Sequence, residues 1–159
     1  HQSVTHRARL NDVGDSVSDF MKALEPLGSR LGVVLFQLPP TFPAGLDRLK
    51  SFLAELPAGQ RFAMEFRHPS WNEPAVIELL REAAVAKCAA ELEIGESEFV
   101  NTAPFAYMRL RKVPPYTDEE LSIARGQIQA IREKVDEIFL YLKHDDEGIA
   151  PDAALRLQT

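Results

Sequence analysis

The chain has 159 residues and a formal net charge of -6, with 45% hydrophobic and 26% charged residues. These values are typical of one globular domain, and the acidic balance excludes a broadly basic nucleic-acid surface, although not a local basic pocket. The single cysteine, Cys88, excludes an internal disulfide. Because it lies in an apolar run, we expect a buried, inert thiol and a reducing, cytoplasmic compartment.

The amino-terminal part of the chain has no membrane-spanning pattern. The longest apolar run, residues 31–38, is too short to cross a bilayer, and no signal peptide is visible. The chain begins at His1 rather than Met, which we interpret as a fragment or a processed chain. Residues 1–10 are polar, and we interpret them as the end of a strand whose beginning is absent. Helical spacing from Val17 to Leu27 predicts a helix that ends at Gly28.

Residues 33–38 then read as a buried strand stopped by Pro39, and apolar residues at helical spacing predict a helix over 46–56. The next strand, 61–67, places Phe62, Met64 and Phe66 on one face and Glu65 and Arg67 on the other. A proline stops it, and residues 70–73 match a capping box for the helix that follows. Both faces of a strand in such a βα unit are covered, so Glu65 and Arg67 are expected to be partly desolvated and paired.

The second half of the chain continues the same rhythm. We predict a helix over 74–86, a weaker strand over 88–94, a strand over 105–111, a helix from the capping box at 117–120 to about 134, a strand over 137–143 and a short helix over 151–157. Alternating strands and helices indicate an α/β fold with a parallel sheet. Both a (β/α)8 barrel and an open doubly wound sheet fit; a barrel usually needs about 250 residues, so a barrel here would be incomplete.

Five segments resemble a known family. They are Thr5-His6 followed by Leu10, residues 31–40 ending in Gln37-Leu38-Pro39-Pro40, Glu65-Phe66-Arg67-His68-Pro69-Ser70-Trp71, residues 106–110 and residues 116–121. In order and spacing they are similar to the domain of unknown function 72 family, also called YecE-like proteins. The resemblance covers nearly the whole chain.

The resemblance implies a TIM-type (β/α) barrel that lacks its N-terminal βα units here. It does not supply a function, because the biochemical function of this family is not established. The chain departs from the family pattern at two places. Arg111-Lys112 stands where family members often have His-Gly, and Lys143-His144-Asp145 stands where many have an Asn-rich turn.

In βα folds, ligands bind beyond the carboxyl ends of the strands. Polar residues follow most of the predicted strands at this end, and we expect them to converge on one mouth. They are Thr5, His6, Gln37, Glu65, Arg67, His68, Glu91, Glu93, Arg109, Arg111, Lys143, His144 and Asp145. Tyr107 and Tyr141 face away from the neighbouring cations only if the strands have the register assumed above.

The predicted mouth is rich in cations although the whole chain is acidic. Arginine side chains suit phosphate or carboxylate, so an anionic small molecule is the leading ligand, held by His6, Gln37, Arg67, Arg109, Arg111 and Lys143. Glu65 is a candidate counter-ion or general base, and His68 and His144 are candidate acid–base groups. The simpler alternatives are that Glu65 pairs with Arg67 or Arg109 as core packing, that His68 anchors a turn, and that His144 lies in a solvated acidic loop.

No metal or other cofactor is expected. Glu65, His68, His144 and Asp145 are chemically able to bind a metal, but no tight ligand spacing supports such a site. Three functions remain open: an enzyme acting on a phosphorylated or carboxylated small molecule, a nucleic-acid-binding or nucleic-acid-processing barrel, and an inactive fragment. The expected partners are a small anion or a nucleic acid but no membrane, with self-association through exposed strand edges.

Overall fold

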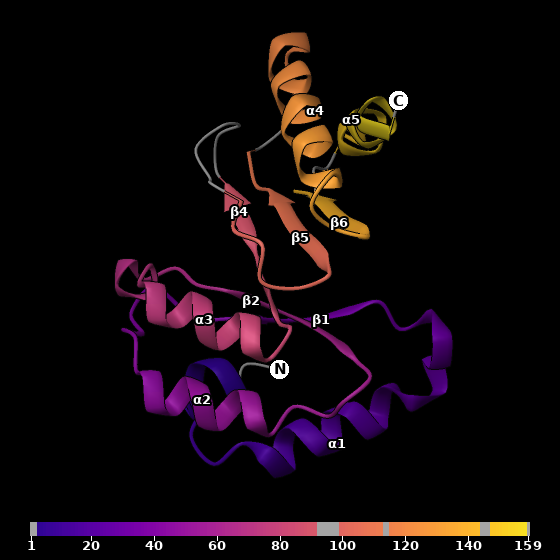
Figure 1. Cartoon of the computed structure of the whole chain (residues 1–159). Helices are drawn as coiled ribbons and strands as arrows, with labels where there is room; N and C mark the ends of the chain where they lie inside the picture. Colours follow the sequence, from indigo (N-terminus) through magenta and orange to yellow (C-terminus); the bar gives the residue numbers. More distant parts are fainter. Residues whose placement is uncertain (1–2, 92–98, 113–114, 144–146, 159) are drawn as a thin grey trace.

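The computed structural model describes residues 3–91, 99–112, 115–143 and 147–158. Strands and helices alternate along most of the chain (Figure 1). The strands are β1 (Val33–Gln37), β2 (Arg61–Glu65), β3 (Ala86–Lys87), β4 (Ala89–Glu91), β5 (Phe105–Leu110) and β6 (Glu137–Leu142). The α-helices are α1 (Gly14–Leu24), α2 (Leu46–Ala54), α3 (Pro74–Glu82), α4 (Asp118–Arg132) and α5 (Ile149–Gln158).

The strands form two three-stranded sheets, in the orders β1-β2-β3 and β4-β5-β6. Every pairing in them is parallel, which confirms the predicted α/β class with parallel strands. The register aligns the carboxyl ends of neighbouring strands: Gln37 pairs with Glu65, and Arg109 with Tyr141. The polar residues at these strand ends therefore lie along one rim of each sheet.

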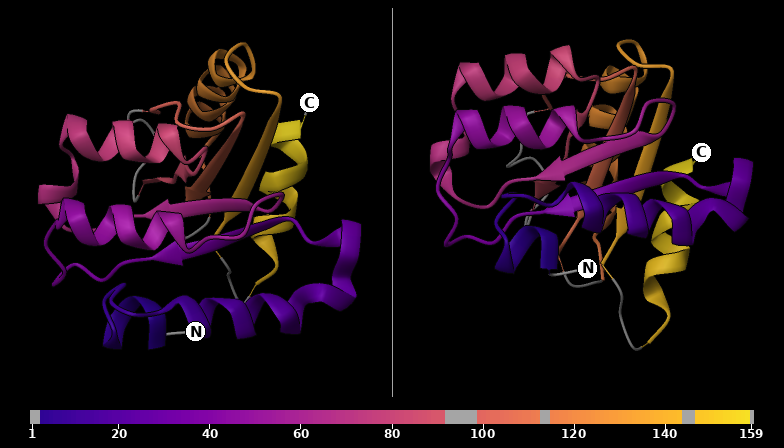
Figure 2. Two further views of the ribbon diagram at one scale, coloured as in Figure 1. Left: turned by 60° about the horizontal axis from the view of Figure 1, so that its bottom comes forward. Right: turned by 90° about the horizontal axis from the view of Figure 1, so that it is seen from below.

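Helices cover the outer face of each sheet. Helices α1, α2 and α3 lie along the first sheet, and α4 and α5 lie along the second (Figures 1 and 2). Under α2 and α3, Phe36 and Phe62 contact each other, and Phe36 meets Phe52 edge-to-face with 5.0 Å between ring centroids. Met64 and Leu80 complete this core. The period-two pattern of the strands therefore predicts the buried outer face correctly.

The inner faces of the two sheets turn toward each other. Arg61 of β2 forms an ion pair with Glu137 of β6, and its guanidinium lies 4.7 Å from the centroid of the Phe139 ring. Phe105 meets Phe139 edge-to-face at 5.9 Å. We call this region the inner surface; it comprises Val33, Leu35, Gln37, Ala63, Glu65, Ala86, Cys88, Phe105, Tyr107, Arg109, Phe139 and Tyr141.

The first residues are helical, so the prediction that residues 1–10 end a strand is wrong over the described part. Ser3–Arg7 forms one wide helical turn, in which the amide of Ala8 donates to the carbonyl of Ser3 at 2.9 Å. Val4 and Thr5 are adjacent in sequence and both buried, whereas a half-buried strand would alternate. His1 lies outside the described residues.

The first α-helix ends earlier than predicted. Helix α1 stops at Leu24, and the chain continues as a 3₁₀ segment over Glu25–Arg30. Gly28 adopts a φ of 51° within this segment, a conformation that costs a residue without a side chain little. The glycine thus interrupts the later turn rather than ending the α-helix itself.

One of the two predicted capping boxes forms. Thr117 accepts from the amide of Glu120, whose carboxylate accepts from the amide of Thr117, so the box that opens α4 is confirmed. The box at residues 70–73 is wrong, because the Ser70 hydroxyl accepts from the distant amide of Ala44. Helix α3 begins at Pro74 after Glu73, which caps it without a side-chain hydrogen bond.

The predicted strand over residues 88–94 is broken. Its described part forms only β4, because Cys88 lies between β4 and the separate strand β3, which belongs to the other sheet and includes Ala86, the predicted end of the preceding helix. The Cys88 amide donates to the carbonyl of Met64 at 2.8 Å, so the chain stays attached to the first sheet where it crosses to the second. None of the described helices combines the length and the apolar composition that crossing a bilayer requires.

Candidate functional site

The candidate site is built around one buried carboxylate, Glu65, the last residue of β2. Its side chain is 1% exposed. The Nε of Arg67 donates to Oε1 of Glu65 at 2.9 Å, and Nη1 of Arg109 donates to Oε2 at 2.5 Å. Nη1 of Arg111 lies 3.6 Å from Oε1. The carboxylate is therefore paired with both arginines that the sequence offered as alternatives, and with a third cation.

Gln37 ties the same group together from the end of β1. Its amide oxygen accepts from Nη2 of Arg67 at 2.8 Å and from Nη1 of Arg109 at 3.3 Å. Arg109 of β5 in the second sheet thus reaches β1 and β2 in the first. We call these five residues the arginine cluster: Gln37, Glu65, Arg67, Arg109 and Arg111.

The arginine cluster carries an excess of positive charge. Three guanidinium groups face one carboxylate, which leaves two cations without a matching anion within the cluster. The arginine side chains remain 28%, 31% and 30% exposed for Arg67, Arg109 and Arg111, respectively. Guanidiniums that are held in place and still reach solvent can donate to an arriving phosphate or carboxylate.

Neutral groups line the inner surface below the cluster. Burial, together with the nearby Glu65 carboxylate, raises the pKa of the Cys88 thiol from 9.0 to about 12, while the arginines oppose this rise. Burial also raises the pKa of the Tyr107 phenol to about 12. Both groups are uncharged near pH 7, so neither offsets the charge of the arginines. Cys88 is a buried free thiol, as the sequence predicted.

A cavity of about 340 Å³ lies beside β1. Both His6 and Gln37 of the arginine cluster line this cavity. The Nδ1 of His6 is 2.8 Å from the hydroxyl of the buried Thr5. Val17 and Phe20 of α1 form part of the apolar wall. Of the predicted ligand-binding residues, Gln37, Arg67, Arg109 and Arg111 are therefore neighbours in the structure, and His6 shares a cavity lining with Gln37.

His68 is engaged in a turn. Its Nδ1 accepts from the amide of Ser70 at 3.2 Å and lies 2.8 Å from the Ser70 hydroxyl, so the ring caps the short 3₁₀ segment Pro69–Trp71. Trp71 is buried behind it and stacks on Phe66 with 4.7 Å between ring centroids. This geometry matches the interpretation of His68 as a turn anchor.

The remaining predicted residues lie at the end of β6. Lys143 is exposed, and its amide donates to the carbonyl of Leu110 at 2.8 Å, but no side-chain contact joins it to the arginine cluster. His144 and Asp145 lie outside the described residues, as does Glu93. Among the described residues, no three His, Cys, Asp or Glu side chains gather closely enough to hold a metal ion.

Two tyrosines belong to the inner surface, contrary to the expectation that they face away from the cations. Tyr107 and Arg109 are two residues apart in β5 and share a face, and Tyr141 pairs in register with Arg109. The Tyr107 and Tyr141 rings contact each other with 5.1 Å between centroids. The sequence could have predicted this arrangement for Tyr107, because residues 107, 109 and 111 are spaced two apart and such residues share a face of a strand.

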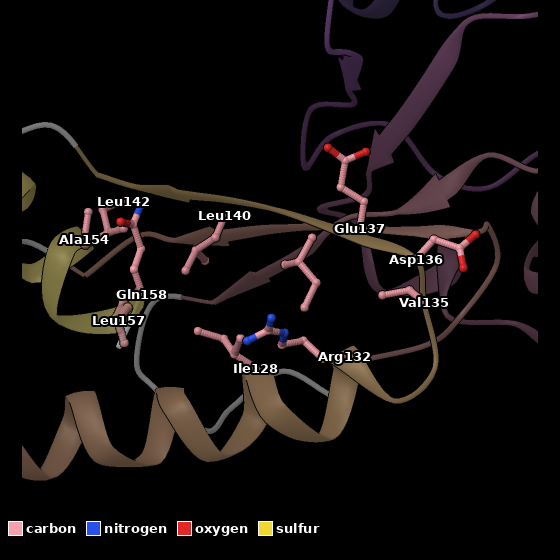
Figure 3. A pocket seen from close by; sticks show the side chains of 11 residues that line it. Ile128, Arg132, Val135, Asp136, Glu137, Leu140, Leu142, Ala154, Leu157 and Gln158 are labelled. Carbon is pink, nitrogen blue, oxygen red and sulfur yellow. The ribbon is translucent and has the colours of Figure 1, made fainter.

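A separate hollow of about 660 Å³ lies on the outer side of β6 (Figure 3). Leu140 and Leu142 of β6, Ile128 and Arg132 of α4, and Leu157 of α5 line it. None of the arginine cluster lines this hollow. It is therefore distinct from the site at the carboxyl ends of the strands.

Comparison with known protein families shows which family this chain belongs to. The model of a family described as "Protein of unknown function DUF72" matches residues 1–159. The chain belongs to the DUF72 family. A related protein, the UPF0759 protein YecE of Escherichia coli K12, is 37% identical over 70 residues, which are 43% of this chain and 26% of YecE. The matched segment thus spans about a quarter of that relative.

Solved structures of DUF72 family proteins share the fold. TM1631 of Thermotoga maritima superposes with a TM-score of 0.84 at 23% identity, over 99% of this chain and 70% of that protein. EF0366 of Enterococcus faecalis V583 gives a TM-score of 0.72 at 17% identity, over 89% of this chain and 66% of that protein. At these identities the similarity establishes the fold but not an activity.

Proposed function

We propose that this DUF72 protein binds a small phosphorylated or carboxylated molecule through Arg67, Arg109 and Arg111. The observation that carries this proposal is the imbalance of the cluster: three guanidiniums surround one buried carboxylate. Glu65 and Gln37 hold two of these arginines in place, so little side-chain entropy is lost when they meet a ligand. A second anion would balance the remaining charge.

Arg111 is the arginine most available to such a ligand. Its Nη1 is 3.6 Å from the carboxylate, beyond normal hydrogen-bond length, whereas Arg67 and Arg109 both donate to Glu65. Glu65 acts in this proposal as a counter-ion that positions the arginines. In both nearby histidines Nδ1 is engaged, in His6 with the Thr5 hydroxyl and in His68 with the Ser70 turn, so either would act through Nε2 in a reaction at this site.

Two further parts of the proposal concern the whole protein. The facing inner surfaces and the parallel strands support an incomplete (β/α)8 barrel, in line with TM1631, which is longer than this chain. In a barrel of this type, the carboxyl ends of the strands are the usual place for ligands. The free, buried Cys88 supports a cytoplasmic location.

Isothermal titration with inorganic phosphate and with citrate tests the binding proposal. Arg111→Gln removes the positive charge and the fork of guanidinium donors, and we expect it to weaken binding by about 10- to 150-fold, the equivalent of one hydrogen bond to a charged group. The matched control is Arg30→Gln, which removes an exposed arginine before the amino end of β1. The proposal fails if neither anion binds, or if both variants lose the same affinity.

A salt titration separates this function from nucleic-acid binding. Contact with several backbone phosphates makes affinity fall steeply with salt. For duplex DNA, the logarithm of the binding constant falls by about 0.9 per contacted phosphate for each tenfold rise in salt concentration. One small anion at one cluster gives a shallow dependence. A steep slope together with affinity for an oligonucleotide would favour the nucleic-acid alternative, in which the same arginines contact a backbone.

A further inference from the structure

An exposed aromatic ring stands beside the arginine cluster. Tyr141 of β6 is 46% exposed, although the other residues of the inner surface near it are largely covered. It pairs in register with Arg109, so both side chains leave neighbouring strands on the same face. Neighbouring strands lie about 4.8 Å apart, which places the ring and the cationic groups within the span of one small molecule.

The ring of Tyr141 is held from one side. Its centroid lies 5.1 Å from that of Tyr107, and the two ring planes are inclined by 31°. Tyr107 itself is only 7% exposed, so it provides a fixed support. A ring that is supported on one side and exposed on the other is a stacking platform that needs little ordering when a ligand binds.

We propose that the anion held by the arginine cluster also carries a planar aromatic ring, which stacks on Tyr141. This inference rests on the anion-binding function proposed above and names the class of molecule, an aromatic anion such as a nucleoside monophosphate. The guanidinium groups favour the same class, because arginine stacks on aromatic faces as well as binding phosphate. A sugar phosphate without a base would use the cations but not the platform.

Three probes of graded chemistry separate these contributions in calorimetric titrations. Inorganic phosphate supplies charge alone, ribose 5-phosphate adds a non-planar sugar, and adenosine monophosphate adds a base. We expect adenosine monophosphate to bind roughly 5- to 150-fold more tightly than ribose 5-phosphate, the range that base stacking on an aromatic side chain supplies.

Two substitutions of Tyr141 locate the source of this preference. Tyr141→Ala should abolish the preference for adenosine monophosphate while leaving the affinity for inorganic phosphate within about twofold, and Tyr141→Phe should retain it because the ring remains. Circular dichroism checks that both variants fold.

The two proposals fail in different ways. If neither inorganic phosphate nor citrate binds the unmodified chain, the anion-binding function fails. If phosphate binds but adenosine monophosphate gains nothing over ribose 5-phosphate, or if Tyr141→Ala keeps the preference, only the aromatic ligand is refuted. A Tyr141→Ala variant that changes the association state without changing ligand preference would likewise refute it and assign the ring to contact between copies of the chain.

Discussion

Replacement of Glu65 by glutamine tests the electrostatic account of the site most directly. The change keeps the size of the side chain but removes the charge that faces Arg67, Arg109 and Arg111. Removing one partner of a buried ion pair costs about 3–5 kcal/mol. The three arginines are 28–31% exposed and recover part of the loss from water. We therefore expect the lower limit, about 3 kcal/mol.

This free energy corresponds to a fall in Tm of about 6–12 °C, at about 2–4 °C per kcal/mol for a chain of this size. Thermal unfolding followed by circular dichroism measures it. Glu78→Gln is the control, because Glu78 forms an exposed ion pair with Arg81, and its loss should cost less than about 1 kcal/mol. Added phosphate should raise the Tm of Glu65→Gln more than that of the unmodified chain, since the anion replaces the lost charge.

A Tm of Glu65→Gln within about 2 °C of the unmodified chain, measured against the scale above, would refute this reasoning. It would mean that the carboxylate contributes little to holding the arginines, and that the cluster is organised by Gln37 and the strand backbone instead. Equal stabilisation of both forms by phosphate would also contradict the account, because the anion would then not be filling the position of the missing charge.

Three other predictions concern stability, reactivity and association. Thr117→Ala removes the α4 cap and should cost about 1 kcal/mol in urea unfolding, whereas Ser122→Ala at an exposed position of the same helix should cost little; equal effects would contradict the capping role. Because the pKa of Cys88 is raised from 9.0 to about 12, the folded thiol should react with Ellman's reagent at pH 8 at least roughly a hundredfold more slowly than the unfolded thiol. The stability that the neutral thiol provides should hold below pH 9.0 and be lost as the pH rises toward about 12, a loss that Cys88→Ala should lack in urea unfolding at each pH. Each sheet has an edge strand, β1 and β6, that pairs on one side among the described strands, so sedimentation velocity should show association that increases with concentration; a monomer at every concentration would count against it.

Local patterns were sufficient for most elements. Period-two alternation predicted β2 and β5, apolar runs predicted β1 and β6, and helical spacing or a capping box predicted α2, α3 and α4 to within a few residues. Ser70 shows where such patterns fail: its sequence context fits a helix cap, but its hydroxyl accepts from Ala44, 26 residues away. A local motif cannot include a competing partner that only the folded chain brings within reach.

The strand ends predicted where a candidate site would lie, but not the contacts within it. The sequence placed Glu65 between two alternatives, a pair with Arg67 or a pair with Arg109, and the structure forms both. We also expected Tyr107 and Tyr141 to face away from the cations, but the observed strand register places both tyrosines on the same face as Arg109.

The amino-acid order by itself determined the alternation of strands and helices, the burial of Glu65 and the gathering of cations at the carboxyl ends of strands, because these follow from side-chain period and from the covering of parallel strands. Only the tertiary structure decided that Arg109 crosses from the second sheet to meet Gln37 and Glu65 of the first. That choice depends on how two sheets face each other, which is set by packing between residues far apart in the chain and leaves no local trace.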